Sequence, residues 1–127
     1  MTYLWVAIGG ALGSVARYAC SGFALRLVGA GFPWGTLFVN VTGSLIIGLL
    51  AGVMSADGRP LLSEDARAFL MVGVLGGFTT FSSFSLETLT LARNGEWLGA
   101  GANVVVSVVL CLVAVWLGYM GATAFNR

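Results

Sequence analysis

The residues best suited to chemistry lie in one segment, from Gly76 to Ser85, inside an otherwise apolar stretch. Two adjacent glycines open it, and hydroxyl side chains follow, among them Thr79, Thr80 and Ser83. Glycine weakens a helix by about 1 kcal/mol per residue, and Ser and Thr offer the backbone other hydrogen bonds. We therefore predict a helix break near residues 76–80, which would free carbonyls to coordinate a cation. The alternative is a kinked helix whose hydroxyls bond to its own carbonyls.

Phe81 and Phe84 follow this predicted break and are three residues apart, so they share one helix face. An aromatic ring has a positive edge. Two such edges, one turn apart, would stabilise a partly dehydrated small anion. Ordinary packing against lipid or protein is the alternative.

Amides and hydroxyls recur in two other apolar stretches. Asn40 has Thr36 one turn before it and Ser44 one turn after it. Farther along, Asn103 and Ser107 begin a stripe with four-residue spacing that ends at Cys111. These side chains either join helices through hydrogen bonds or replace water around a moving anion.

Two ionisable residues lie inside apolar stretches, where charge is costly and marks function by default. Arg17 would attract an anion into an aqueous vestibule. Glu87, one turn after Phe84, would accept hydrogen bonds from nearby hydroxyls. The sequence equally allows these two residues to pair with each other.

The composition predicts that lipid surrounds the elements that carry these residues. Of the 127 residues, 58% are hydrophobic and 9% are charged. An average soluble domain has about 25% charged residues, so this chain lacks the charged coat that water requires. We predict an integral membrane protein with a single domain over residues 1–127.

Four segments are long and apolar enough to cross a bilayer, which takes about 20 residues. We expect an all-α protein with helices over about residues 3–23, 35–55, 66–91 and 97–125, the third broken mid-membrane. Pairs of small residues at four-residue spacing, such as Gly9 with Gly13, predict close helix packing.

The arginines give this four-span arrangement almost no preferred orientation. One side would carry Arg59, Arg67 and Arg127, and the other would carry Arg26, Arg93 and, near the end of its helix, Arg17. Orientation normally follows an excess of Lys and Arg on the cytoplasmic side. Either a weak bias suffices, or the chain inserts both ways and forms an antiparallel, dual-topology homodimer. Four helices enclose too little volume for a pore through one subunit, and this also favours a dimer.

Other features exclude further classes. A net charge of +1 indicates neither nucleic acid nor an acidic partner. Histidine is absent, so no histidine proton relay or metal site exists. Cys20 and Cys111 have no metal-ligand spacing and are expected to be free. No phosphate-binding motif, nucleophile–base pair or metal cluster suggests a nucleotide site or an enzyme.

Three stretches resemble the Fluc (also called CrcB) family of fluoride channels, and the resemblance covers nearly the whole chain. The first is Gly9–Gly13 with Arg17-Tyr18, and the second is Gly35–Asn40 followed by Gly43. The third, Gly76–Ser85 followed by Glu87, is the longest and most specific.

The resemblance implies an antiparallel, dual-topology homodimer with two fluoride pores. It further implies a structural sodium ion at the dimer centre, held by the backbone carbonyls of Gly76 and Thr79. The pore phenylalanines would be Phe81 and Phe84, and the pore asparagine Asn40. A polar track in the fourth helix would include Asn103, Ser107 and Cys111, where Cys111 departs from the usual Ser or Thr and a thiol is a weak donor.

The resemblance predicts a passive channel in the inner membrane that exports fluoride and confers fluoride resistance. Fluoride would enter near Arg17, lose water against Asn40 and the hydroxyls, and pass Phe81 and Phe84 before leaving along the fourth helix. The sequence does not separate structural from conductive roles for Thr80, Ser83 and Glu87.

Two other functions compete with this prediction. Small multidrug-resistance transporters are also four-helix, dual-topology dimers, but they need a membrane-embedded Glu in the first helix. Here that helix has Arg17 and no acidic residue. The second competitor is a non-transporting subunit of a larger membrane assembly.

Overall fold

The structure is a computed structural model that describes residues 1–54 and 61–126, and all of its described regular elements are helical. Three helices flank and cross the bundle: α1 (Thr2–Val28), α2 (Trp34–Met54) and α6 (Trp97–Phe125). The third stretch is divided into α3 (Glu64–Arg67), the π-helix η1 (Ala68–Leu75), α4 (Gly76–Phe78) and α5 (Phe81–Arg93). Arg59 and Arg127, two of the arginines used to assess orientation, and the last residue of the helix predicted over 35–55 lie outside the described residues.

The helix ends follow local chemistry. α1 continues to Val28, past the predicted end at residue 23, because no glycine or proline occurs between that residue and Gly29. Gly29 adopts a φ of 77°, in the left-handed region that glycine tolerates. Its N–H donates to the carbonyl of Leu25, which closes the helix. Gly95, with a φ of 80°, plays the same part in the turn between α5 and α6.

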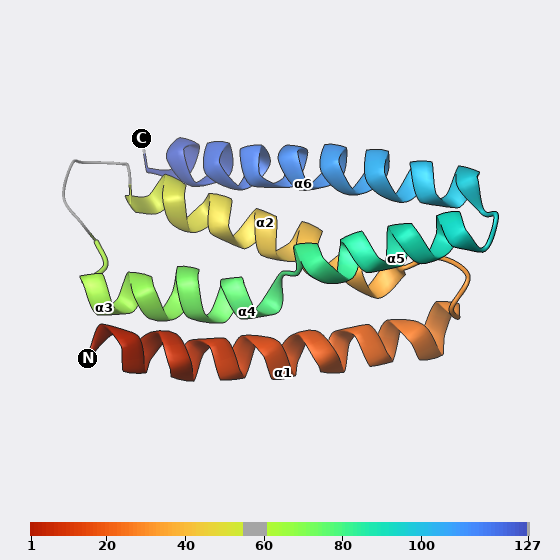
Figure 1. Ribbon diagram of the computed structural model, residues 1–127. Helices are drawn as coiled ribbons and strands as arrows, with labels where there is room; N and C mark the ends of the chain where they lie inside the picture. Colours follow the sequence, from red (N-terminus) through yellow and green to blue (C-terminus); the bar gives the residue numbers. More distant parts are fainter. Residues whose placement is uncertain (55–60, 127) are drawn as a thin grey trace.

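The third stretch changes partners along its length (Figure 1). Its first part, η1 and α4, lies along α1, whereas α5 lies along α6. α2 crosses between these layers and makes its most extensive contact with α6. The N- and C-terminal ends of the chain lie at the same end of the bundle.

Glycines set the closest approaches between helices, as the small-residue spacing predicts. A Cβ atom added to Gly73 would lie 2.9 Å from the Cα of Gly9, so the backbones of η1 and α1 nearly touch there. A Cβ atom on Gly52 would lie 2.6 Å from the carbonyl oxygen of Tyr119, which brings α2 against α6 in the same way. The bundle therefore has little room for a core of large side chains, and among residues 1–54 and 61–126 only Val39 and Asn103 are both large and fully buried.

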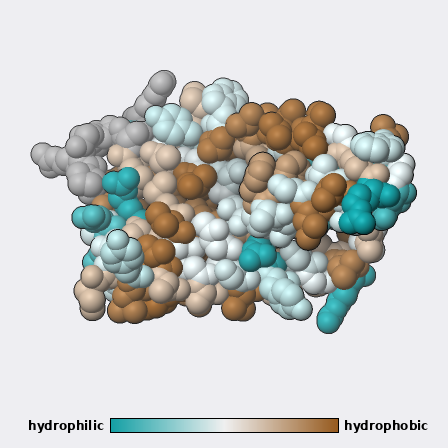
Figure 2. All heavy atoms as spheres, in the orientation of Figure 1, coloured by the Kyte–Doolittle hydropathy of each residue, from teal (hydrophilic) through white to brown (hydrophobic). Residues whose placement is uncertain are grey.

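Large apolar side chains instead cover the outside of the molecule. In Figure 2 the hydrophilic residues gather mainly at the two ends, with hydrophobic residues between them. Within the part of the chain that the structure describes, three helical stretches are long and apolar enough to cross a membrane: Trp34–Met54, Glu64–Arg93 and Trp97–Phe125.

The sequence analysis counted four such segments, and the first of them, α1, is a long helix with less support from its composition than the other three. α1 has 27 residues but is not among the stretches apolar enough to span on composition. Its glycines and Arg17 lower its mean hydropathy. The same glycines let the backbone of α1 pack closely against η1. Close packing of this kind stabilises a helix of lower hydropathy within a membrane bundle.

Candidate functional site

Thr79 and Thr80 interrupt the helical backbone between α4 and α5. Both are extended, with φ and ψ of −85° and 157° for Thr79 and of −154° and 113° for Thr80. They lie within the region where the sequence places a break. Gly76 and Gly77 themselves remain helical, and Thr79 Oγ1 donates to the carbonyl of Leu75 at 2.9 Å, which completes the last turn.

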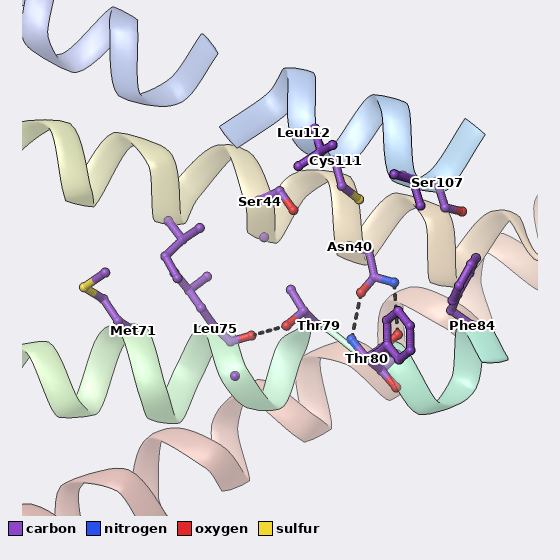
Figure 3. Close-up of a pocket in the computed structure, with 15 residues that line it drawn as sticks. Asn40, Ser44, Met71, Leu75, Thr79, Thr80, Phe84, Ser107, Cys111 and Leu112 are labelled. Atoms are coloured by element: carbon purple, nitrogen blue, oxygen red, sulfur yellow. Dashed lines mark hydrogen bonds between the residues drawn. The ribbon is translucent and has the colours of Figure 1, made fainter. Parts of the chain in front are cut away.

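Asn40 of α2 forms hydrogen bonds to the end of the interruption that is next to α5 (Figure 3). Its Nδ2 donates to the carbonyl of Thr80 at 3.0 Å, and its Oδ1 accepts from the N–H of Thr80 at 2.7 Å. The amide thus pairs with one residue's backbone as a neighbouring strand would. A buried backbone group without a partner costs free energy, so Asn40 stabilises an extended residue among helices.

Arg17 of α1 forms a hydrogen bond at the other end, next to α4. Its Nε donates to the carbonyl of Gly77 at 3.0 Å. This carbonyl is one of those that a helix end leaves without an internal partner. Arg17 is therefore engaged with the backbone of α4, and not with Glu87.

Glu87 finds its partner on α2 instead. Thr36 Oγ1 donates to Glu87 Oε1 at 2.8 Å. The other carboxylate oxygen, Oε2, is buried without a hydrogen-bond partner among the described residues. Arg17 and Glu87, which the sequence allows to pair, thus lie in separate contacts.

Thr80 also begins the second half of the stretch. Its Oγ1 accepts from the N–H of Ser83 at 3.1 Å, the contact of a helix N-cap. The hydroxyls of Thr80 and Ser82 lie 3.2 Å apart. The contact between Thr80 and Ser83 is therefore the contact expected at the start of a helix.

A cavity of about 420 Å³ lies beside the interruption and brings together side chains from α2, α5 and α6. Its lining combines most of the predicted pore residues with apolar ones. The polar part and the two aromatic rings are Asn40, Ser44, Thr79, Thr80, Phe81, Phe84, Ser107 and Cys111. Among the described residues of its wall, Asn103, Arg17, Ser83 and Glu87 are absent.

The two phenylalanines differ in exposure although they touch each other. Their ring centroids are 5.4 Å apart and the rings are tilted by 49°. Phe84 is 9% exposed, whereas Phe81 is 77% exposed. Phe84 is thus part of the cavity wall, and Phe81 stands at its open side.

The polar stripe of α6 reaches α5 through its innermost member. Asn103 is 1% exposed, and its Nδ2 donates to Thr88 Oγ1 at 2.9 Å. Ser107 Oγ donates to Asn103 Oδ1 at 3.2 Å. Cys111 has a free thiol and lines the cavity. The stripe therefore includes an interhelical hydrogen bond as well as cavity-lining groups.

Thr88 was missed by the sequence analysis. It lies four residues after Phe84, and its Oγ1 donates to the carbonyl of Phe84 at 2.8 Å. That spacing, on the face shared with Phe84, was the available signal. Which side chain of another helix it meets is decided by packing.

Backbone carbonyl oxygens at the interruption are the groups that could coordinate a cation. Among the described residues, no group of three or more His, Cys, Asp or Glu side chains forms a metal site. The carbonyls of Leu75, Gly77 and Thr80 accept the hydrogen bonds that tie the interruption to its surroundings. Those of Gly76 and Thr79 are not among these acceptors, so in donor chemistry they fit an alkali cation.

Helices of this length and hydropathy, joined around a cavity lined by both polar and apolar side chains, define a multi-pass, all-helical membrane protein. The family model described as CrcB-like protein, Camphor Resistance (CrcB) matches residues 4–119. The chain belongs to this family, which confirms the resemblance drawn from its motifs.

Curated relatives match over nearly their full length. The chain is 58% identical over 127 residues to a protein of Rhodospirillum rubrum, covering 100% of this chain and 98% of the relative. It is 60% identical over 124 residues to one of Opitutus terrae, covering 98% and 94%. Both relatives are named "Fluoride-specific ion channel FluC".

Proposed function

We propose that this protein is a fluoride-selective passive ion channel. The observation that carries the proposal is the cavity, which gathers Asn40, Phe81, Phe84 and Ser107 from three helices. The full-length similarity to proteins named fluoride-specific ion channels supports it. The protein lies in the inner membrane and exports fluoride that has entered the cell as HF and dissociated, which gives fluoride resistance.

The path follows the residues around the cavity. Fluoride enters an aqueous vestibule near Arg17 and loses water against Asn40 and neighbouring hydroxyls. It then passes the edges of Phe81 and Phe84 and leaves along the α6 stripe. Flow is driven by the electrochemical gradient of fluoride alone.

The working unit is an antiparallel homodimer of two oppositely inserted copies. Support comes from the open side of the cavity, where Phe81 is 77% exposed. The near balance of arginines between the two sides of the membrane also favours dual insertion. In this arrangement all four long stretches cross the bilayer, including α1, and the interruption at Thr79 and Thr80 lies at mid-membrane depth, where protein must cover it.

A structural sodium ion belongs to the same proposal. The carbonyls of Gly76 and Thr79 would hold it, because helix interruptions expose carbonyls that suit such ions. A fixed cation would join the interrupted helices of the two copies. Replacing sodium with N-methyl-D-glucamine should then lower the temperature at which the purified dimer dissociates, and an unchanged temperature would argue against a sodium site.

The decisive experiment measures ion release from liposomes that contain the purified protein. Fluoride electrodes should record fast fluoride efflux, and a matched chloride measurement should record none. Asn40→Asp should abolish fluoride efflux, because it removes the donor to Thr80 and adds a negative charge beside the path. Asn126→Asp, the same change at an exposed position, is the matched control and should conduct like the wild type.

The competing functions predict different results. A non-transporting assembly subunit would release neither ion although it remains folded. A multidrug transporter would move cationic compounds in exchange for protons and would not release fluoride. Neither competitor explains why the cavity wall pairs hydroxyls and an amide with two aromatic rings.

A further inference from the structure

A chain of four hydrogen-bonded groups runs behind the cavity wall from α6 to α5. It begins at Ser107 and ends at the backbone of Phe84, and both of these residues line the cavity. Between them lie Asn103 and Thr88, which are absent from the described lining. The buried Asn103 and the half-buried Thr88 therefore connect two residues of the cavity wall without lining the cavity themselves.

Chemistry fixes the direction of every hydrogen in this chain. Thr88 Oγ1 bonds to the carbonyl of Phe84 at 2.8 Å, and a carbonyl only accepts, so Thr88 uses its single hydrogen there. Thr88 can then only accept from Asn103, which must present its Nδ2. The Oδ1 of Asn103 consequently faces Ser107, and an amide oxygen only accepts.

Ser107 must therefore give its hydroxyl hydrogen to Asn103. In this arrangement the Ser107 oxygen offers lone pairs, and not a hydrogen, to the rest of its surroundings. Ser107 is 7% exposed and Asn103 is 1% exposed, so water does not readily take the place of either partner. An anion in the cavity can gain this donor only by taking the hydrogen away from the Asn103 oxygen.

We propose that Asn103 is a specificity-determining residue, which makes Ser107 a donor only to strongly accepting anions. The inference rests on the proposed fluoride conduction and deepens it. Fluoride is small and accepts hydrogen bonds strongly, so its bond to the Ser107 hydroxyl offsets the free energy of the lost bond to Asn103. Chloride is larger and accepts hydrogen bonds weakly. Its bond to Ser107 would not offset the free energy of leaving the buried Asn103 oxygen unpaired. Thr88 is a positioning residue, because it holds the amide of Asn103 in the required orientation.

The test compares chloride and fluoride efflux in liposomes for a set of variants. Asn103→Leu frees the Ser107 hydroxyl to serve weaker acceptors, so the chloride-to-fluoride rate ratio should rise about tenfold, the change expected from one hydrogen bond. Ser107→Ala should slow fluoride without admitting chloride. The double variant should lose the extra chloride flux again, because Asn103 acts through Ser107.

Thr88→Val should raise the ratio in the same direction but less, since the amide of Asn103 is then free to turn over. Thr90→Val is its matched control. Thr90 Oγ1 makes the same type of bond, to the carbonyl of Leu86 at 2.9 Å, on an exposed part of the same helix. This control should keep the wild-type ratio.

An unchanged ratio in folded Asn103→Leu, or extra chloride flux that persists in the double variant, would overturn the inference. If Asn103→Leu does not fold, Asn103→Ala makes the same comparison with a smaller side chain. Failure of the proposed function is distinguishable, because the wild type itself would then release no fluoride.

Discussion

The two halves of the third stretch differ in almost every physical respect, although only Thr79 and Thr80 separate them. The first half, α3 to α4, packs on α1 through glycine backbones. The second half, α5, packs on α6 and carries side-chain hydrogen bonds to its neighbours. Backbone contacts at glycines dominate the first half, which has two side-chain hydrogen bonds to α1, from Thr2 to Asp65 and from Arg17 to Gly77, whereas α5 is joined to α2 and α6 by side-chain hydrogen bonds.

This difference explains how an interruption can persist in a membrane protein. The first half ends where Arg17 takes the carbonyl of Gly77, and the second begins where Asn40 takes both backbone groups of Thr80. Each half thus has an anchor on a different helix, the first on α1 and the second on α2. Both halves line the cavity, α5 with the aromatic rings of Phe81 and Phe84 and η1 with the apolar side chains of Met71 and Leu75.

The largest expected effect comes from breaking the glycine half. Gly13→Ala places a Cβ atom against the carbonyl of Val74 and the backbone of Phe78, neither of which can move aside easily. We expect a loss of roughly 3 kcal/mol in stability, seen as a lower melting temperature in mild detergent by size-exclusion chromatography. Gly22→Ala, on the same helix with open space around it, should leave the melting temperature unchanged or raise it. Equal effects of the two changes would contradict shape as the anchor.

The next effect comes from the anchor of the polar half. Asn40→Ala leaves the N–H and the carbonyl of Thr80 without their side-chain partner. Because an unpaired buried group costs about 1–3 kcal/mol, we expect a loss of about 2 kcal/mol in stability. Thermal unfolding of the purified protein checks this, with the exposed Asn126→Ala as control. A melting temperature equal to that of the control would show that the interruption does not need Asn40.

A smaller effect compares the caps of the two halves. Thr80→Val removes the acceptor for Ser83 at the start of α5, and Ser63→Ala removes the acceptor for Ala66 at the start of α3. Loss of an N-cap costs about 1 kcal/mol. We expect that loss at Thr80, and less at Ser63, whose bond is exposed. The comparison would be reversed if the thermal shift at Ser63 were the greater.

The smallest effect is expected inside the last turn of the first half. Thr79→Val removes the hydroxyl bond to Leu75, but the backbone N–H of Thr79 also donates to that carbonyl at 3.0 Å. The change should cost about 0.5 kcal/mol or less, while fluoride efflux persists. A large loss of folded protein would show that the hydroxyl itself holds the turn.

Much of the architecture could be predicted because it depends on local properties. The long apolar stretches predict α2 and α6, whose observed bounds lie within a residue of the predicted ranges. Gly, Thr and Ser gather at residues 76–85, and the extended backbone falls at Thr79 and Thr80. The π-helix of η1, which lies in close contact with α1, was not anticipated. The low mean hydropathy of α1 follows from its composition, and the sequence analysis overlooked it.

The sequence by itself determined that the protein is helical and membrane-embedded, that polar residues concentrate near one interruption, and to which family it belongs. These properties are sums of local terms, such as hydropathy, propensity and motif spacing. Only the tertiary structure decided that Arg17 bonds to Gly77, Asn40 to Thr80 and Asn103 to Thr88. Those partners lie far apart in the chain, and helix packing brings them together, so spacing alone leaves each polar group with several possible partners.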